Sequence, residues 1–240
     1  MLDLHCHILP GLDDGAAELG VSLEMAALAA DSGVTHVFAT PHCNTRNPQK
    51  NFRSRKLIEA YTALQRELDR AGIPIRILSG AEVLARGHFA QHLAAGDFMT
   101  LNASRYLLVE FYFDESPAYI EDCLAAVEDE GLVSVVAHPE RYFCVQHAPE
   151  LAQRWADAGR VLQLNKGSLL GDLGEDAYIT AALLLRRGAV SVIASDAHHF
   201  RFRTPHMGAL LDCLARRFPE ADPALLLREN PLRIAKDQTL

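Results

Sequence analysis

The chain has 240 residues, of which 49% are hydrophobic and 22% are charged, and its formal net charge is −8 at pH 7. This is the composition of an ordinary globular protein, and it excludes a chain that is disordered, collagenous or coiled-coil throughout. The length fits one large domain or two small ones. The excess of acidic residues argues against a general nucleic-acid-binding surface and against an anionic-membrane surface.

The sequence carries no signal for membrane insertion or export. No stretch reaches the roughly 18 uncharged apolar residues that a membrane helix requires. The opening Met-Leu-Asp-Leu-His lacks the basic and apolar regions of a signal peptide. Five cysteines, an odd number spread along the chain, fit reduced thiols better than a disulfide framework. We therefore expect a cytoplasmic protein.

Short β-rich runs recur along the chain and are typical of buried strands. The seven runs lie at residues 2–4, 35–39, 75–79, 106–111, 132–137, 161–164 and 189–194. The longer segments between them carry apolar residues at helical spacing, as at Leu57, Tyr61, Leu64 and Leu68. We predict helices over residues 19–30, 57–68, 117–130, 148–158, 175–187 and 205–218.

Glycines mark the ends of the predicted helices, because a left-handed residue commonly closes a helix. Those that lie one to three residues before a strand are Gly33, Gly72, Gly131, Gly159 and Gly188. Strict alternation of strands and helices requires parallel strands, and seven units without a break in composition favour a closed barrel over an open doubly wound sheet. We expect an α/β fold, a TIM-like (β/α)7 barrel that forms a single domain over residues 1–240. Residues 44–51 are predicted to form a mobile loop.

Barrel enzymes build their active sites at the carboxyl ends of the strands. Here all seven ends are polar, and six of them offer metal ligands: His5 and His7, His42, Glu82, Glu110, His138, and Asp196 with His198. Side chains two apart on a strand point to the same face, so the HxH and DxH spacings let both side chains reach one pocket. Imidazoles mixed with carboxylates, without converging thiolates, suit Mn²⁺, Fe²⁺ or Zn²⁺ in a multinuclear site.

Asp14, in Leu12-Asp13-Asp14-Gly15, could supply a further oxygen ligand. The alternative is an Asx turn closed by Gly15. If Asp14, Glu82, Glu110 and Asp196 are ligands of three divalent ions, two positive charges remain in excess. An acidic protein would then hold a cationic pocket, which suits phosphate esters.

Two arginines follow strand-end motifs closely enough to reach such a pocket. Arg141 lies three residues after His138, and Arg203 lies five residues after His198. The guanidinium fork matches phosphate oxygens in a bidentate way, so both are candidates for a phosphate clamp. For Arg203, a solvated loop is the alternative.

A cysteine-based phosphatase is excluded, because it needs an arginine six residues after its cysteine. The residues at that position after the five cysteines are Leu12, Gln49, Asp129, Glu150 and Pro219. Walker A, GxGxxG, GxSxG and HExxH motifs are also absent. Strand alternation turns Cys6 away from His5 and His7, so packing is its expected role.

The strand-end strings together resemble a known family. They are HCHILPGLDDG at 5–15, ATPH at 39–42, GAE at 80–82, AHPERY at 137–142, LNKGSLLG at 164–171 and SDAH at 195–198. They resemble the PHP (polymerase and histidinol phosphatase) superfamily. Within it they are similar to the CpsB/CapC/YwqE-type manganese-dependent protein-tyrosine phosphatases of bacterial capsule and exopolysaccharide clusters. The similarity spans nearly the whole chain, and the string at 5–15 is specific to that branch.

The resemblance implies a distorted (β/α)7 TIM-like barrel, the PHP fold, with three ions, expected to be Mn²⁺ with Fe²⁺ or Zn²⁺ as alternatives. By carry-over, the first ion would be held by His5, His7, Glu82 and Asp196. The second would be held by Glu82, Glu110 and His138, and the third by Asp14, His42 and His198. Arg141 and Arg203 would match the phosphate-binding arginines.

The resemblance also implies the partner, a phosphotyrosine protein, and specifically the tail of a bacterial tyrosine kinase that controls capsule or exopolysaccharide synthesis. Two positions depart from the family. Cys6 stands where serine is common, and Lys166 stands where a small residue usually follows Asn165. If Lys166 faces the pocket, it could alter substrate preference.

Three alternatives stay open. One is a PHP-type phosphatase of a small phosphomonoester such as histidinol phosphate. Another is an amidohydrolase-like barrel, which also opens with HxH, although its fourth strand usually ends in a bridging lysine where this chain has Glu110. The last is a regulatory or binding module that retains the fold, against which the intact ligands at six strand ends argue.

Overall fold

The structure is a computed structural model that describes residues 1–45 and 50–240. Half of the loop predicted to be mobile, 46–49, lies outside the described residues. The two flanks of that loop are fixed by asparagine side chains. The amide of Asn44 donates to the carbonyl of Leu84 at 3.0 Å, and the amide of Asn51 donates to the carbonyls of Leu12 and His42, both at 2.8 Å.

The paired strands run parallel, in the orders β1-β2-β4 and β3-β5-β6-β7-β8-β9. Their bounds are β1 Leu2–Cys6, β2 His36–Ala39, β3 His42–Cys43, β4 Arg76–Ser79, β5 Glu82–Leu84, β6 Tyr106–Glu110, β7 Val133–Ala137, β8 Val161–Asn165 and β9 Val192–Ala194. The seven predicted runs are therefore confirmed. The short strands β3 and β5 continue the second and third runs after breaks at 40–41 and 80–81. Proline at position 41 has no amide hydrogen to give to a ladder, which is one cause of the first break.

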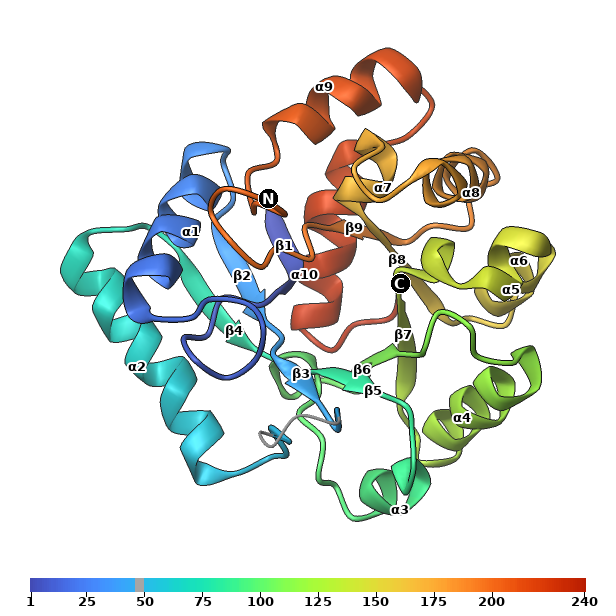
Figure 1. The fold of residues 1–240 in the computed structure, drawn as a ribbon, viewed down its shortest axis with the longest axis horizontal. Coiled ribbons are helices and arrows are strands. Elements are labelled where there is room, and N and C mark those ends of the chain that lie inside the picture. Colours follow the sequence, from blue (N-terminus) through green and yellow to red (C-terminus); the bar gives the residue numbers. More distant parts are fainter. Residues whose placement is uncertain (46–49) are drawn as a thin grey trace.

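The first strand meets the segment that follows the last one. The amide of Asp196 donates to the carbonyl of His5 at 2.9 Å, and the amide of His7 donates to the carbonyl of Ala197 at 2.8 Å. Cys6 and Ala197 form a parallel bridge. In Figure 1 the strands gather at the centre and the helices surround them. The expected α/β class and distorted barrel are confirmed.

The six predicted helices are present as α1 Leu19–Asp31, α2 Arg55–Ala71, α4 Pro117–Asp129, α6 Glu150–Asp157, α8 Glu175–Arg186 and α9 Gly208–Arg217. Four short helices were not predicted: α3 Phe89–Ala94, α5 Phe143–His147, α7 Lys166–Leu170 and α10 Asn230–Ala235. None is longer than six residues, so none carries enough turns for a periodic signal. All five glycines predicted to end helices have left-handed φ values, between 67° and 87°.

An irregularity in β1 determines where the apolar interior of the barrel ends and the polar site begins. Leu2 and Leu4 pack in the barrel interior with apolar residues of the other strands, such as Phe38 and Val135. The register against β2 shifts by one residue between Asp3 and Cys6, as in a β-bulge. Because of the bulge, His5 points inward as Leu4 does. His5 therefore lies next to the apolar layer of the barrel interior.

Candidate active site

Imidazole rings from several strand ends crowd the mouth of the barrel. His7 lies at the centre, with its ring centroid 4.0 Å from that of His198 and 4.5 Å from that of His42. The ring of His5 lies 5.2 Å from His7 and stacks on His138 at 5.9 Å. His5, His7, His138 and His198 are buried, and His42 is partly exposed. The strand ends predicted to converge do so.

Buried acceptors fix the orientation of two central rings. His5 Nδ1 lies 2.9 Å from Gln163 Oε1, and His7 Nδ1 lies 2.7 Å from Asp13 Oδ2. An amide or carboxylate oxygen can only accept, so each Nδ1 donates and each Nε2 presents a lone pair. The two Nε2 atoms lie 3.1 Å apart. Two lone pairs at this distance repel each other unless a proton or a cation lies between them.

Glu82, at the start of β5, is surrounded by histidines. Its Oε2 lies 3.2 Å from His5 Nε2, 3.3 Å from His7 Nε2 and 2.9 Å from His42 Nδ1. Its Oε1 lies 2.9 Å from His138 Nε2. This one carboxylate therefore faces four rings and can bridge two cations.

The donor atoms form three compact groups, in each of which all of them lie within 4.8 Å of one another. The groups are His5, His7 and Asp196; His42, Glu82 and Glu110; and His7, Asp14, His42 and His198. His138 lies beside the second group, with Nε2 3.6 Å from Glu110 Oε1. The structure thus brings all nine residues predicted as metal ligands into one cluster.

The charges of this cluster depend strongly on one another. Burial disfavours the charged form of Glu82, but attraction by His5 and then His42 holds the pKa of its carboxyl well below the usual range. Burial and then repulsion by Glu82 raise the pKa of the Glu110 carboxyl to about 8. Burial lowers the pKa of His42, but Glu82 outweighs burial and raises it to about 9. The protein's own groups therefore leave the site short of positive charge.

The donor set fits divalent cations. His42 Nδ1 and Glu82 Oε2 lie 2.9 Å apart. Neither atom has a hydrogen-bond partner among the residues that the structure describes. Close, unbonded nitrogen and oxygen donors are the arrangement expected where a cation is shared. The residues present therefore fit a multinuclear metal centre.

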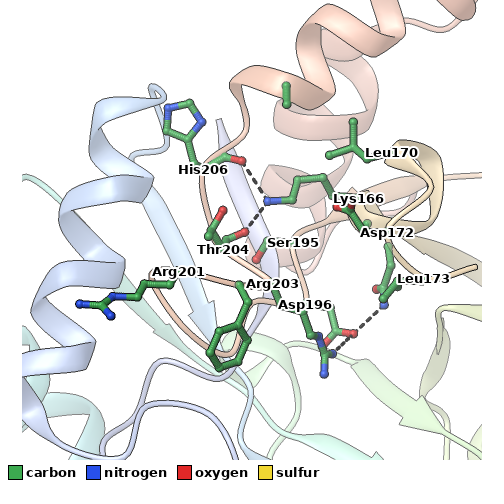
Figure 2. Close-up of a pocket in the computed structure, with 14 residues that line it drawn as sticks. Lys166, Leu170, Asp172, Leu173, Ser195, Asp196, Arg201, Arg203, Thr204 and His206 are labelled. Carbon is green, nitrogen blue, oxygen red and sulfur yellow. Dashed lines mark hydrogen bonds and ion pairs between the residues drawn. The ribbon is translucent and has the colours of Figure 1, made fainter.

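Both predicted arginines reach Asp196, whose Oδ1 faces the histidines. Arg203 Nη2 donates to Asp196 Oδ2 at 2.5 Å (Figure 2). Arg141 Nη1 lies 3.6 Å from the same oxygen. Asn165 donates its side-chain amide to that oxygen as well, at 2.5 Å. The Arg141 guanidinium lies 4.3 Å from the ring centroid of Phe113, a cation–π contact. The Arg203 side chain is therefore held at the edge of the cluster by Asp196.

The backbone is left-handed at three of these positions. The φ angles are 34° at His138, 49° at Asp196 and 45° at Arg203. Side chains other than glycine rarely adopt this region, and such residues concentrate at functional sites because the surrounding structure must enforce them. The left-handed turns aim the imidazole, the carboxylate and the guanidinium into one space.

The two neighbouring aspartates have different roles. Asp13, not Asp14, forms the Asx turn, because its Oδ1 accepts the amide of Gly15 at 3.0 Å. Its Oδ2 accepts from His7 Nδ1 and from the amide of His42 at 2.9 Å. Asp14 stays free to face the cluster, with Oδ1 3.4 Å from His42 Nε2. A Cβ at Gly15 would lie 2.2 Å from the carbonyl oxygen of His7, so only glycine fits there.

Sequence reasoning did not identify the residues that orient the ligands. Besides Asp13, these are Gln163 and Asn165 of β8, where Gln163 accepts from His5 and donates to Asn165 Oδ1 at 2.9 Å. Both amides are buried. A signal was available, since a metal-binding histidine usually donates its second ring nitrogen to a carbonyl or carboxylate.

The cysteines lie outside this cluster. Cys6 is buried among apolar residues of the layer between strands and helices, as its predicted packing role requires. Burial raises the pKa of its thiol well above the usual range, so a thiolate is disfavoured. All five thiols are free.

Comparison with known proteins agrees with the site. A family model described as capsular polysaccharide synthesis, CpsB/CapC, matches residues 1–236. The tyrosine-protein phosphatase YwqE of Bacillus subtilis (strain 168) is 34% identical over 240 residues, which cover all of this chain and 93% of that protein. The tyrosine-protein phosphatase CpsB of Streptococcus pneumoniae is 27% identical over 245 residues, which cover both proteins completely.

A solved structure has the same fold. It comes from work on YwqE from Bacillus subtilis and CpsB from Streptococcus pneumoniae, described as unique metal-dependent tyrosine phosphatases. It superposes with a TM-score of 0.91 at 33% identity, covering all of this chain and 96% of that one. The resemblance found in the sequence is confirmed, and the chain belongs to the CpsB/CapC family.

Proposed function

We propose that this protein is a metal-dependent protein-tyrosine phosphatase. The observation that carries the proposal is the cluster of histidines and carboxylates with two arginine side chains directed at its edge. The names of its relatives support the same activity. Because the donors come from strand ends between His5 and His198, we also propose that residues 1–240 act as one catalytic domain.

We propose three manganese ions as the cofactor. His5, His7, Glu82 and Asp196 would hold the first, Glu82, Glu110 and His138 the second, and Asp14, His42 and His198 the third. Carboxylates suit Mn²⁺, while imidazoles also accept Fe²⁺ or Zn²⁺. When bound, such ions supply an activated water and neutralise charge on the phosphoryl oxygens.

The protein's own residues bind and orient the ester. Arg141 and Arg203 would hold phosphoryl oxygens through charge-assisted hydrogen bonds, with Phe113 restraining Arg141 from below. Asp13 and Gln163 keep the lone pairs of His7 and His5 directed at the cluster. The tyrosine phenol has a pKa of about 10, so it leaves far more readily than an alkyl alcohol. A strong general acid is therefore not needed.

We propose a phosphotyrosine protein as the partner, specifically the tail of a bacterial tyrosine kinase in polysaccharide synthesis, because the matched family is described by capsular polysaccharide synthesis. Among the described residues, no helix has the length and apolar content needed to cross a bilayer. The five free thiols suit a reducing compartment, which supports our assignment to the cytoplasm.

One assay separates the candidate activities. Purified protein is stripped with a chelator, reloaded with Mn²⁺, Fe²⁺ or Zn²⁺, and given a phosphotyrosine peptide, a phosphoserine peptide, histidinol phosphate and an amide panel. We expect phosphate release from the phosphotyrosine peptide, lost on chelation and restored best by Mn²⁺. Preference for histidinol phosphate or an amide would reject the proposal.

A further inference from the structure

A cavity of about 420 Å³ opens beside the cluster, at the ends of β5 and β6. Its lining combines ligand candidates, including Glu110 and His42, with the apolar residues Leu84, Phe111 and Phe113. Its size lies within the range of ligand pockets, which are mostly apolar with a few polar groups at one side. The cavity is therefore an apolar space that adjoins the charged centre.

Phe113 links this cavity to the phosphate clamp. Its ring lies under the guanidinium of Arg141 at 4.3 Å and edge-on to His138 at 6.2 Å. Phe113 is 37% exposed, so the part of its ring that Arg141 does not cover can receive a ligand. A group attached to a phosphoryl oxygen held by Arg141 would meet this ring first.

The cavity on the other side of the centre has a different character. It measures about 520 Å³, and its lining includes Lys166, Asp172, Arg201 and Arg203 (Figure 2). An uncharged hydrocarbon ring gains little beside several charged side chains, because it displaces water from them and offers no hydrogen bond in return. The lining of the cavity beside Glu110 has fewer charged side chains and two phenylalanines, Phe111 and Phe113, so of the two cavities it suits an aromatic ring better.

We propose that the cavity beside Glu110 is the subsite for the aromatic ring of the substrate, with Phe113 as a specificity-determining residue that packs against that ring. This inference rests on the proposed function, which places the phosphoryl group at the metal centre. Paired aromatic rings add affinity beyond simple burial, equivalent to about three- to tenfold in a dissociation constant. The subsite selects aryl phosphates over alkyl phosphates by contact with the ring, independently of the ease with which the phenol leaves.

The test uses two phosphonates that cannot be hydrolysed, phenylphosphonate and methylphosphonate. Their dissociation constants for the metal-loaded protein are measured by calorimetry, and the selectivity is the ratio of the methyl to the phenyl value. Phe113→Ala releases Arg141 from its stacking partner, which weakens both ligands alike and cancels in the ratio. Phe202→Ala is the matched control, since Phe202 is 63% exposed and lines the other cavity.

We expect Phe113→Ala to lower the selectivity about three- to tenfold and Phe202→Ala to leave it unchanged. An unchanged ratio in Phe113→Ala, or a fall in Phe202→Ala instead, would overturn the inference. Hydrolysis of a phosphotyrosine peptide by the unmodified protein is measured in parallel. If that hydrolysis is absent while Phe113 still controls phosphonate selectivity, the proposed function fails and the subsite stands.

Discussion

Lys166 Nζ donates a hydrogen bond of 2.9 Å to the carbonyl oxygen of His206. The same ammonium donates to the carbonyl of Thr204 (Figure 2), and the Lys166 side chain is almost fully buried. These carbonyls lie one and three residues after Arg203. Lys166 therefore places a buried positive charge that holds the loop bearing Arg203, and its ammonium is directed at backbone oxygens and not at the candidate metal ligands.

Lys166→Met keeps the length of the side chain and removes both hydrogen bonds. We expect the loop to loosen and inorganic phosphate to bind about tenfold more weakly, because hydrogen bonds from a charged donor contribute about 1.5–3 kcal/mol each. Metal content should stay the same. Isothermal titration with phosphate and metal analysis measure both, and the exposed Lys236 gives the control Lys236→Met. Unchanged phosphate affinity would show that Lys166 does not position Arg203.

Removing a ligand should abolish both metal binding and turnover. Glu82→Ala is the most severe case, because this carboxylate faces four histidine rings and no other side chain can replace it. We expect His5→Ala and His138→Ala to lose metal and activity as well. Metal analysis after dialysis, with phosphate release from a phosphotyrosine peptide, measures the outcome. If a variant keeps its full metal content and a normal rate, the replaced residue is not a metal ligand and is removed from the proposed set.

Asp13→Asn tests the orienting carboxylate. Both oxygens of Asp13 accept from donors, from Gly15 at Oδ1 and from His7 and His42 at Oδ2. An asparagine must turn its NH₂ group toward one of these donors, whichever way the amide lies. We expect metal affinity to fall about 10- to 100-fold, as for other residues that orient metal ligands. Competition with a fluorescent chelator measures it, and an affinity equal to that of the unmodified protein would contradict the role.

Arg141→Lys tests the phosphate clamp. The planar fork is stacked on Phe113, and lysine offers neither the fork nor the stacked plane. We expect a loss of about 2–4 kcal/mol in transition-state stabilisation, by analogy with removal of one preorganised donor. Metal content should be unaffected. Steady-state kinetics on a phosphotyrosine peptide gives the value, and kinetics indistinguishable from the unmodified enzyme would place Arg141 outside the clamp.

Replacing all five cysteines with serine or alanine should leave a folded enzyme with substantial turnover. The reason is that the cluster consists of histidines and carboxylates, while Cys6 and Cys43 are buried in the apolar core. Some stability will be lost through the cavities and polar atoms that the changes introduce. Circular dichroism, metal analysis and turnover are measured together. An inactive variant with intact fold and metals would point to a thiol in the chemistry.

The parallel strands and the convergence of the candidate ligands were predictable, because the carboxyl ends of parallel strands must meet at one end of a barrel. His5 and Asp196 are far apart in sequence, yet each lies within two residues of the end of a predicted β-rich run. That both Leu4 and His5 of β1 point inward was not predictable, because the bulge between Asp3 and Cys6 depends on pairing with β2. The role of Arg203 depends on a left-handed backbone that returns its carbonyl to the amide of His198, a contact with no local sequence signal.

The hydrogen bonds between β1 and the segment after β9 also imply when, during synthesis of the chain, the proposed metal site can form. His5 and His7 leave the ribosome early, but Asp196, which shares the first ion with them in the proposed sets, emerges almost two hundred residues later. An ion that meets the early histidines finds an incomplete coordination shell and dissociates easily. Stable metal uptake must therefore wait until the last strand docks against the first, so retained metal reports that the ring of strands has closed.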